Sequence, residues 1–428
     1  MFYLLYNLLS FFLLIPLVLF TIFRAIKLKW PLAILPRFGL IPACELAKIQ
    51  GRQVILLHAV SVGEVMAARV LMRALKERYP GYALIISCGT ETGRETALGF
   101  SEVDLCIYLP FDYLFSVRLM LSRLNPCMVI VMETEIWPNF THEIAAREIP
   151  LILANGRISD RSFGRYLKLR WFFRHALLNF SLLCMQSDLM RERIIAIGAP
   201  KERAVVAGNL KLDIQPRVTA EADKLSLRQR YLVPQNCLIL TAGSTHPGEE
   251  ALLLEIYREI LESGGKLFLV LAPRHPQRAD EVAAIVENAG IPFRRLTETA
   301  GYEPLGCGEI LLVDKVGELM NLYALADIGF VGGSMVPKGG HNLLEPASCG
   351  LPVVFGQQMA NFREIATLVN ACQAGVQVAD AAELGSVLRR LVQDKGERER
   401  LGSRGLEMIR KNGGATARHL EVISALMP

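Results

Sequence analysis

Residues 331–356 read VGGSMVPKGGHNLLEPASCGLPVVFG. This segment joins two apolar runs, and between them lie glycine pairs at 332–333 and 339–340, one lysine, one histidine and one glutamate. Glycine lets the backbone approach a ligand closely and adopt positive φ. A helix that begins near Asn342 would present free N–H groups to a phosphate, so the pattern indicates a nucleotide-phosphate pocket. The same spacing also fits an ordinary capped helix, with Asn342 as N-cap and Glu345 three residues later.

Short apolar runs alternate with helical patterns on both sides of a polar segment at 208–217, which we interpret as a linker. The first series covers 54–60, 83–88, 105–110, 127–133 and 151–155, and the second covers 238–243, 267–273, 310–315, 327–333 and 352–356. Such runs are typical of parallel strands that are covered by helices on both faces. We therefore predict an α/β fold with two Rossmann-like, doubly wound domains that face each other across a cleft at the carboxyl ends of their strands.

The first residues predict a membrane anchor. Residues 4–23 are almost continuously apolar, and the first charges are Arg24, Lys27 and Lys29. About 20 apolar residues suffice to span a bilayer, and the basic start and cleavage site of a signal peptide are absent. The positive-inside rule then places the rest of the chain in the cytoplasm. A buried core helix, or a segment bent at Pro16 that lies in the inner leaflet, are the alternatives.

These boundaries predict an anchor at 1–30, a first domain at 31–212 and a second at 213–428, whose final helix could cross back to the first. A chain of 428 residues is long enough for two cores.

The formal net charge of +5 does not indicate a nucleic-acid partner and suits an anionic substrate or a membrane surface. The nine dispersed cysteines include no C-x-x-C pair, which favours a reducing compartment without disulfides or structural zinc.

The stretch HAVSVGE at 58–64 follows the first predicted strand and opens the first predicted helix. Glu64 would lie at the mouth of the cleft, where a carboxylate can take a proton from an attacking hydroxyl. The spacing of Ser61 and Glu64 also fits a capping box, which is a purely structural role. His58 fits a core histidine better than a catalyst.

Two further stretches of the first domain carry charge. ETEIWPN at 133–139 places Glu133 and Glu135 directly after a strand, where sites usually form, although loop charges fit equally well. Residues 155–174 interleave six basic side chains with five aromatic ones, and four of the basic side chains share one helical face. In a membrane-anchored protein such a face could bind anionic head groups or a phosphorylated lipid. A solvated basic face is the alternative.

In the second domain Arg274 and Lys338 are candidate phosphate partners, as a fork and a point charge respectively. No D-x-D occurs in the chain. This absence removes one common way of holding a divalent metal on a nucleotide diphosphate.

Eight blocks of the sequence together resemble one family, the 3-deoxy-D-manno-octulosonate (Kdo) transferases of lipopolysaccharide inner-core assembly. The blocks are HAVSVGE, ETEIWPN, NGRISDRS, GNLKLD, AGSTHPGEE, PRHPQR, VGELMNLYALAD and GGSMVPKGGHNLLEPA. They extend over nearly the whole chain after the N-terminal segment, and that segment itself fits the family's membrane anchor. Eight blocks in the right order are far more specific than one glycine motif.

The resemblance implies an inverting glycosyltransferase of the two-domain GT-B kind at the bacterial inner membrane. Its donor would be CMP-Kdo and its acceptor the tetraacyldisaccharide 1,4'-bisphosphate precursor of lipid A (lipid IVA), without a tightly bound metal or other cofactor. Carried over by motif, Glu64 is the catalytic base. The residues implied for the CMP site are Pro273, Arg274, Val316, Gly317, Glu318, Asn342, Leu343, Leu344 and Glu345. Leu343 departs from the family, which usually has proline there, and this loses no contact because proline at N1 only pre-sets the backbone.

Other functions remain as alternatives at this point. The same architecture serves transferases that use UDP-sugars and nucleotide-sugar epimerases. A non-catalytic, membrane-tethered scaffold is a second alternative, although Glu64 and the implied pocket residues are all present. A dehydrogenase is disfavoured because no G-x-G-x-x-G follows the first strand near Val60.

Overall fold

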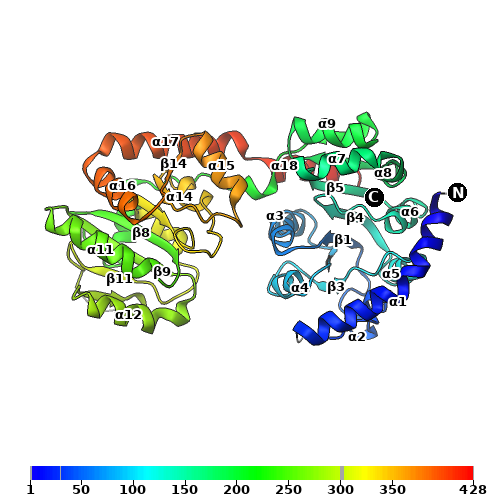
Figure 1. The fold of residues 1–428 in the computed structure, drawn as a ribbon, viewed down its shortest axis with the longest axis horizontal. Helices are drawn as coiled ribbons and strands as arrows, with labels where there is room; N and C mark the ends of the chain where they lie inside the picture. The colour runs from blue at the N-terminus through cyan, green and yellow to red at the C-terminus, as the bar shows by residue number, and fades with distance from the viewer. Residues whose placement is uncertain (1, 29, 299–302, 428) are drawn as a thin grey trace. The chain divides into compact units, whose positions relative to one another are not determined.

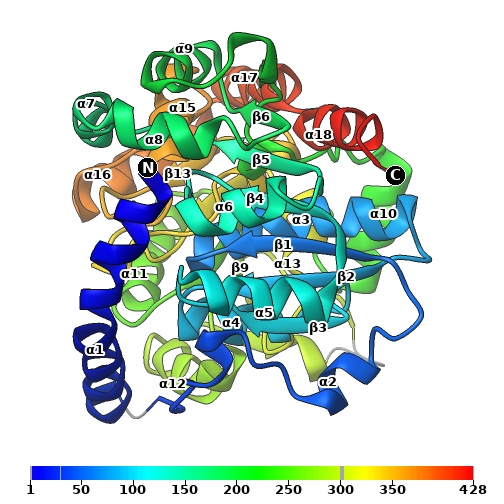
Figure 2. The same ribbon diagram turned by 90° about the vertical axis from the view of Figure 1, so that its right-hand side faces the viewer.

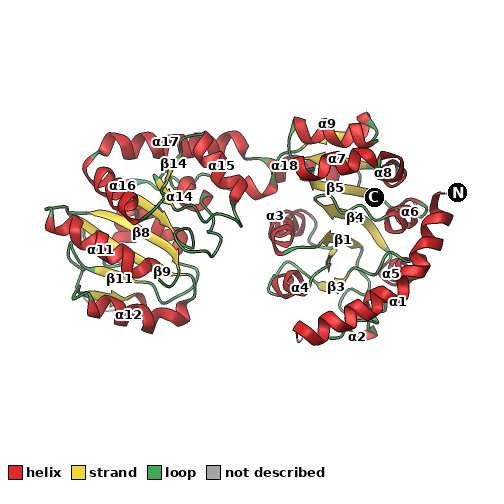
Figure 3. Ribbon diagram, in the orientation of Figure 1, coloured by secondary structure: helices red, strands yellow, loops and turns green. Residues whose placement is uncertain are grey.

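The computed structural model describes residues 2–28, 30–298 and 303–427. The chain forms two compact units, one made of Met1–Asp213 with Gly414–Pro428 and the other of Ile214–Gly413. Each unit is built on a parallel β-sheet with helices on both faces (Figures 1 and 3). The two parallel α/β domains predicted from the apolar runs are confirmed.

The first unit contains a seven-stranded sheet in the order β3-β2-β1-β4-β5-β6-β7, and all neighbouring strands are parallel. The strands are β1 (Val54–Ala59), β2 (Ala83–Cys88), β3 (Leu105–Tyr108), β4 (Pro126–Met132), β5 (Leu151–Gly156), β6 (Leu182–Met185) and β7 (Ala204–Val206). The first five coincide with predicted runs. The strands β6 and β7 lie outside the predicted runs.

Helices cover both faces of this sheet because side chains alternate along each strand. Leu56 of β1 belongs to the core beneath α5 and α6, whereas Ile55 and Leu57 belong to the core beneath α3 and α18. The helices are α1 (Phe2–Leu28), α2 (Ala43–Ala47), α3 (Val62–Arg78), α4 (Glu91–Leu98), α5 (Leu114–Leu124), α6 (Pro138–Ala145), α7 (Asp160–Lys168), α8 (Arg170–Leu177), α9 (Asp188–Ile197) and α18 (Ala415–Ser424). The last helix of the chain therefore packs in the first unit.

The second unit contains another parallel sheet of seven strands, in the order β10-β11-β9-β8-β12-β13-β14. The strands are β8 (Leu238–Thr245), β9 (Leu267–Pro273), β10 (Phe293–Arg295), β11 (Ile310–Leu312), β12 (Ile328–Val331), β13 (Val353–Phe355) and β14 (Gly375–Gln377). The edge strands β10 and β14 are half-buried and lie outside the predicted runs. The helices are α10 (Glu221–Arg230), α11 (Glu249–Glu262), α12 (Ala279–Asn288), α13 (Leu319–Leu325), α14 (Leu344–Ser348), α15 (Arg363–Ala371), α16 (Ala381–Gln393) and α17 (Lys395–Asn412).

The N-terminal helix α1 has 27 residues and is long and apolar enough to cross a membrane. Within it only Ala25 is buried. A core helix, one of the alternatives that the sequence left open, is therefore wrong. The helix runs along the surface of the first unit, with its first turns beside α6 and α8 (Figure 2).

Candidate active site

Three glutamates follow two neighbouring strands of the first unit. Glu64 lies in the first turn of α3, shortly after β1 ends, and Glu133 and Glu135 follow β4. Because β1 and β4 pair in parallel, their carboxyl ends meet at the same edge of the sheet. The two acidic stretches predicted from the sequence therefore contribute to one carboxylate cluster.

The Glu64 carboxylate is held by donors from its own helix start, and the residue is 8% exposed. Its Oε2 accepts the Val60 N–H at 2.9 Å, and its Oε1 accepts the Ser61 hydroxyl at 2.7 Å. Ser61 Oγ accepts the Glu64 N–H at 3.3 Å, so the capping box is present as well. Burial raises the pKa of Glu64, the charge of Glu133 raises it further, and the bonds from Val60 and Ser61 oppose both effects. A preorganised carboxylate with a raised pKa is suited to accept a proton.

Glu133 is paired with a cation from a distant part of the chain. Lys211 Nζ lies 2.6 Å from Glu133 Oε1. Glu133 itself has φ of 55°, in the left-handed region that non-glycine residues rarely adopt. Lys211 Nζ is also 3.9 Å from the position of a Cβ placed on Gly63. The Lys211 ammonium group thus lies next to Glu133, after β4, and next to the first turn of α3, which carries Glu64.

Glu135 completes the cluster. Burial and the charge of Glu64 raise the pKa of Glu135 to about 7, while the indole N–H of Trp137, which donates to Oε2 at 3.0 Å, opposes the shift. Glu135 therefore changes its charge near neutral pH. A raised pKa is a common property of carboxylates in functional sites, and the functional role of Glu64 and Glu135 stays a prediction.

His58 has a structural role. It is fully buried on β1, and its Nδ1 lies 3.1 Å from the Ser87 carbonyl and 3.0 Å from the Ser87 hydroxyl. Burial lowers the pKa of His58 to about 4, so the ring is neutral at physiological pH. The prediction of a core histidine is confirmed.

The second unit gathers imidazoles and a guanidinium near the carboxyl ends of its strands. Pro273 ends β9, and Arg274 and His275 follow it directly. His246 Nε2 and His341 Nε2 lie 2.9 Å apart with parallel rings, and His275 packs edge-on against His246. Burial and then the charge of Arg274 lower the pKa of His341 to about 4. The His341 imidazole, neutral at physiological pH, and the Arg274 guanidinium form an environment that suits an anionic ligand.

The first glycine pair of the loop after β12 serves a buried carboxylate. Glu249 is fully buried. Its carboxylate accepts four backbone N–H groups at 2.7–3.1 Å, those of His246, Gly333, Ser334 and Met335. Gly332 packs so closely on β8 that a Cβ would lie 2.4 Å from the Ser244 carbonyl oxygen. The N–H groups of this part of the loop are therefore bound within the protein by Glu249.

Residues 342–345 enter the short helix α14, which begins at Leu344, two residues after Asn342, as predicted. Asn342 Oδ1 accepts the Leu344 N–H at 3.1 Å, and Asn342 Nδ2 donates to Glu345 Oε1 at 3.3 Å. Asn342 thus accepts a backbone N–H two residues on, and Glu345 bonds the Asn342 amide rather than a backbone N–H, so the alternative of a capping box between these residues is wrong. Leu343 and Leu344 are buried and contribute packing. Burial raises the pKa of Glu345.

Glu318 precedes α13 and holds two side chains from the end of α10. Its carboxylate accepts the Tyr231 hydroxyl at 2.5 Å and lies 3.2 Å from Arg230 Nη2. The bond from Tyr231 contributes most to lowering the pKa of Glu318. Val316 is 79% exposed and Gly317 has φ of 92°, so an open turn precedes this bonded group.

The predicted donor residues thus fall into two groups. Burial has the largest effect on both Glu345 and His341: it raises the pKa of Glu345 and lowers the pKa of His341. The charge of Arg274 lowers the pKa of both groups, so Arg274 lies close to each of them. Glu318 belongs to the separate group with Tyr231. The sequence predicts neither the role of Glu249 nor that of the His246–His341 pair. The position of His246 in GSTH, at the end of a strand, is the one signal that could have found it.

The nine cysteine thiols are free. Within residues 2–28, 30–298 and 303–427, no group of three or more His, Cys, Asp or Glu side chains is placed to hold a metal ion. A reaction without a tightly bound metal stays a prediction.

Two α/β units, each on a parallel sheet, are the architecture of the GT-B fold, which glycosyltransferases share with nucleotide-sugar epimerases. A solved glycosyltransferase from Rickettsia africae shares the fold over 88% of this chain and 99% of its own, with a TM-score of 0.51 and 14% identity.

Sequence relatives give the family. The model of the 3-deoxy-D-manno-octulosonic-acid transferase (kdotransferase) family matches residues 33–214. The 3-deoxy-D-manno-octulosonic acid transferase of Haemophilus influenzae is 37% identical over 87% of this chain and 86% of that protein. The solved C-terminal CMP-Kdo binding domain of WaaA from Acinetobacter baumannii is 31% identical, covering 44% of this chain and 97% of that one, with a TM-score of 0.41. The chain belongs to the family of Kdo transferases, glycosyltransferases of lipopolysaccharide biosynthesis.

Proposed function

We propose that this chain transfers Kdo from CMP-Kdo to the tetraacyldisaccharide 1,4'-bisphosphate precursor of lipid A, with Glu64 as the general base. The observation that carries the proposal is the Glu64 carboxylate beyond the carboxyl end of β1, where burial raises its pKa and three hydrogen bonds hold it. Membership of the family supports Kdo as the transferred sugar.

In the proposed step, Glu64 takes the proton of an acceptor hydroxyl while that oxygen attacks the anomeric carbon of Kdo. The new carbon–oxygen bond forms as the bond from the anomeric carbon to the phosphate oxygen breaks. CMP leaves with the bonding electrons, and the anomeric configuration inverts. The Val60 and Ser61 donors fix the carboxylate before the reaction, so the rate gain comes from positioning and proton transfer.

We assign the donor to the second unit. Arg274 would bind the phosphate of CMP with two N–H groups, and the neutral imidazoles of His246 and His341 would add hydrogen bonds. Glu345 would accept hydrogen bonds from the ribose. Because α14 has only five residues, we place the charge stabilisation of the leaving phosphate on these side chains and not on a helix dipole. This arrangement needs no tightly bound metal.

We further propose that α1 anchors the protein at the cytoplasmic face of the inner membrane. Its apolar side chains are largely exposed, and its cationic end carries Arg24 and Lys27. Arg161 and Arg165 of α7 are exposed on the same unit, and Phe2 of α1 packs against the adjoining helix α8. The basic segment would then contact anionic head groups or an acceptor phosphate.

The test is incubation of membranes that carry the protein with the lipid A precursor and a CMP-Kdo supply, followed by mass spectrometry of the products. Glu64→Gln should reduce transfer by about 100-fold or more, while calorimetry should show unchanged CMP-Kdo binding. Glu95→Gln, at an exposed position of α4, is the matched control.

Three outcomes would contradict parts of the proposal. Near-normal transfer by Glu64→Gln would remove the base assignment. Products formed from UDP-sugars in competition with CMP-Kdo would favour the alternative donor. Absence of turnover with every activated sugar would favour a scaffold.

A further inference from the structure

Helix α1 is attached to the first unit near both of its ends. At the start, the Tyr6 hydroxyl donates to Asp112 Oδ2 at 2.9 Å, and Asn7 exchanges two side-chain hydrogen bonds with Asn139. At the end, Ala25 is buried and its carbonyl accepts the Trp30 N–H at 2.9 Å. The helix therefore forms a wall over the carboxyl edge of the first sheet.

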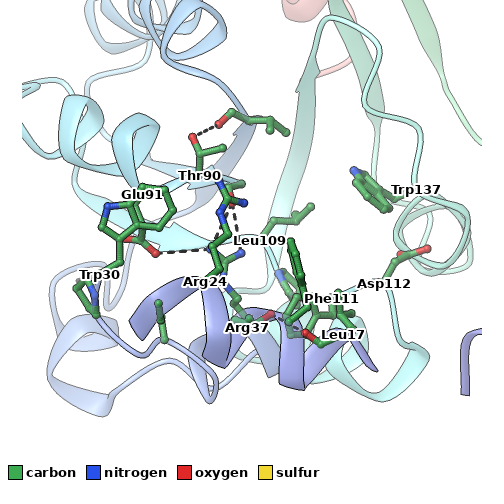
Figure 4. Close-up of a pocket in the computed structure, with 18 residues that line it drawn as sticks. Leu17, Arg24, Trp30, Arg37, Thr90, Glu91, Leu109, Phe111, Asp112 and Trp137 are labelled. Carbon is green, nitrogen blue, oxygen red and sulfur yellow. Dashed lines mark hydrogen bonds and ion pairs between the residues drawn. The ribbon is translucent and has the colours of Figure 1, made fainter. Parts of the chain in front are cut away.

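This wall encloses a pocket of about 400 Å³, within the size range of small-molecule sites (Figure 4). Leu17, Phe20 and Thr21 of α1 form one side. The segments that follow β1, β2, β3 and β4 form the other, together with residues from 30–37. The pocket thus lies where ligands bind in open parallel sheets.

The charged groups Arg37, Glu91 and Asp112 around the pocket are already paired within the protein. Arg37 lies 3.6 Å from Glu91 and donates to the Gly89 carbonyl at 3.3 Å. Asp112 accepts the Tyr6 hydroxyl and two backbone N–H groups. An occupant therefore meets mainly aliphatic and aromatic surface, as a hydrocarbon chain requires.

One positive charge borders the pocket without a carboxylate partner. Arg24 is exposed, and its guanidinium lies 4.9 Å from the centroid of the Trp30 ring. Among the residues that the structure describes, no acidic side chain forms an ion pair with it. A guanidinium at the edge of an apolar pocket fits the phosphate of an amphiphile.

Two residues join the pocket to the carboxylate cluster. Val60 lines the pocket, and its N–H donates to Glu64 Oε2. Trp137 also lines it, and its indole N–H donates to Glu135 Oε2. An amphiphile in this pocket is therefore next to the base assigned above, which favours the acceptor over a bystander lipid of the bilayer.

We propose that this pocket binds one fatty acyl chain of the acceptor lipid, with an acceptor phosphate at Arg24. The inference rests on the proposed function for the identity of the acceptor. In this arrangement α1 has two roles, since its exposed side faces lipid and its inner side holds the substrate chain beside Glu64.

The test uses the full-length protein and two photoreactive probes, the tetraacyl disaccharide bisphosphate and phosphatidylglycerol, each with a diazirine at the end of one acyl chain. Peptide mapping should place the cross-links of the disaccharide probe within 17–37 and 109–112. Thr21→Phe fills the pocket and removes only a hydroxyl that bonds to Leu17 of the same helix. It should lower this labelling by about fivefold and raise the KM for the acceptor by about tenfold, with the KM for CMP-Kdo unchanged.

Leu19→Phe adds comparable bulk on the exposed side of α1 and should leave labelling and KM unchanged. Arg24→Gln should weaken labelling by the phosphorylated disaccharide more than labelling by a dephosphorylated analogue. Equal labelling by phosphatidylglycerol would assign the pocket to bilayer lipid, and labelling unaffected by Thr21→Phe would overturn the pocket itself. Cross-linking needs no turnover, so the Glu64→Gln protein should be labelled like the parent. The labelling therefore tests the acyl-chain pocket separately from the assignment of Glu64 as the base.

Discussion

Lys211 Nζ lies 2.6 Å from Glu133 Oε1, across 78 positions of sequence. Lys211 belongs to the short 3-10 helix Leu210–Leu212, inside the segment 208–217 that the sequence indicates as a linker. The supposed linker thus supplies the cation of the carboxylate cluster. The negative charge of Glu133 raises the pKa of Glu64. Because Lys211 pairs with Glu133, we expect the ion pair to make this increase smaller.

Lys211→Met should therefore raise the pKa of Glu64 further, since it removes the cation beside Glu133. A general base is active when ionised, so activity is lost as the pH falls through its pKa. We expect the acid limb of the kcat/KM profile to move to higher pH, by about one unit, so that transfer at pH values below that limb falls by on the order of tenfold. Lys211→Arg keeps the cation and is the control. An acid limb at the same pH in all three proteins would argue against the coupling.

Local patterns were sufficient to predict several parts of the site. Glu64 follows a wholly buried strand, and its spacing from Ser61 marks the start of α3. Arg274 follows β9 directly. Both positions depend only on where a strand ends, and continuous apolar runs show this clearly. The same runs predict the two parallel sheets except for β6 and β7 and for the edge strands β10 and β14, which are only half-buried and so lack a continuous apolar run.

Contacts between distant segments could not be predicted in this way. The His246–His341 pair depends on β8 lying next to β12, and no local pattern gives the order of strands in a sheet. The glycines at 332–333 illustrate the opposite problem. Their pattern is the same whether the loop N–H groups bind a phosphate or Glu249, and only the tertiary contact distinguishes the two.

Glu135→Gln should stabilise the protein at neutral and alkaline pH. Burial and the charge of Glu64 raise the pKa of Glu135 to about 7, whereas a glutamate in the unfolded chain titrates near about 4.3. The folded state therefore binds this proton more tightly, and stability falls as the pH rises from about 4 through about 7. Glutamine carries no charge and keeps an acceptor for Trp137. Thermal unfolding should show a higher Tm for the variant at about pH 8, and a difference that vanishes below about pH 4.

Glu95→Gln is the control for this series, because Glu95 is exposed on α4. It should leave the pH dependence of the Tm unchanged. A constant offset between Glu135→Gln and the parent at every pH would show that packing, and not ionisation, causes the difference.

Asn7→Leu tests whether α1 rests on the first unit. Asn139 is fully buried, and its Oδ1 accepts the Asn7 Nδ2–H at 2.9 Å. Leucine would leave that oxygen without this donor, at a cost of about 1–3 kcal/mol. Chemical unfolding in detergent should show the loss, whereas Leu9→Ile, at an exposed position of the same helix, should not. Equal stability of all three proteins would mean that α1 does not pack there in solution.

Glu249→Ala should destabilise the second unit strongly. Alanine would leave four backbone N–H groups without their acceptor, and each unpaired buried donor costs about 1–3 kcal/mol, so we expect a loss of about 4 kcal/mol or more. Glu255→Ala removes an exposed carboxylate from the same helix and is the control. Both variants are compared by chemical unfolding, with CMP binding measured in parallel. Unchanged stability would mean that the loop holds its shape without the carboxylate.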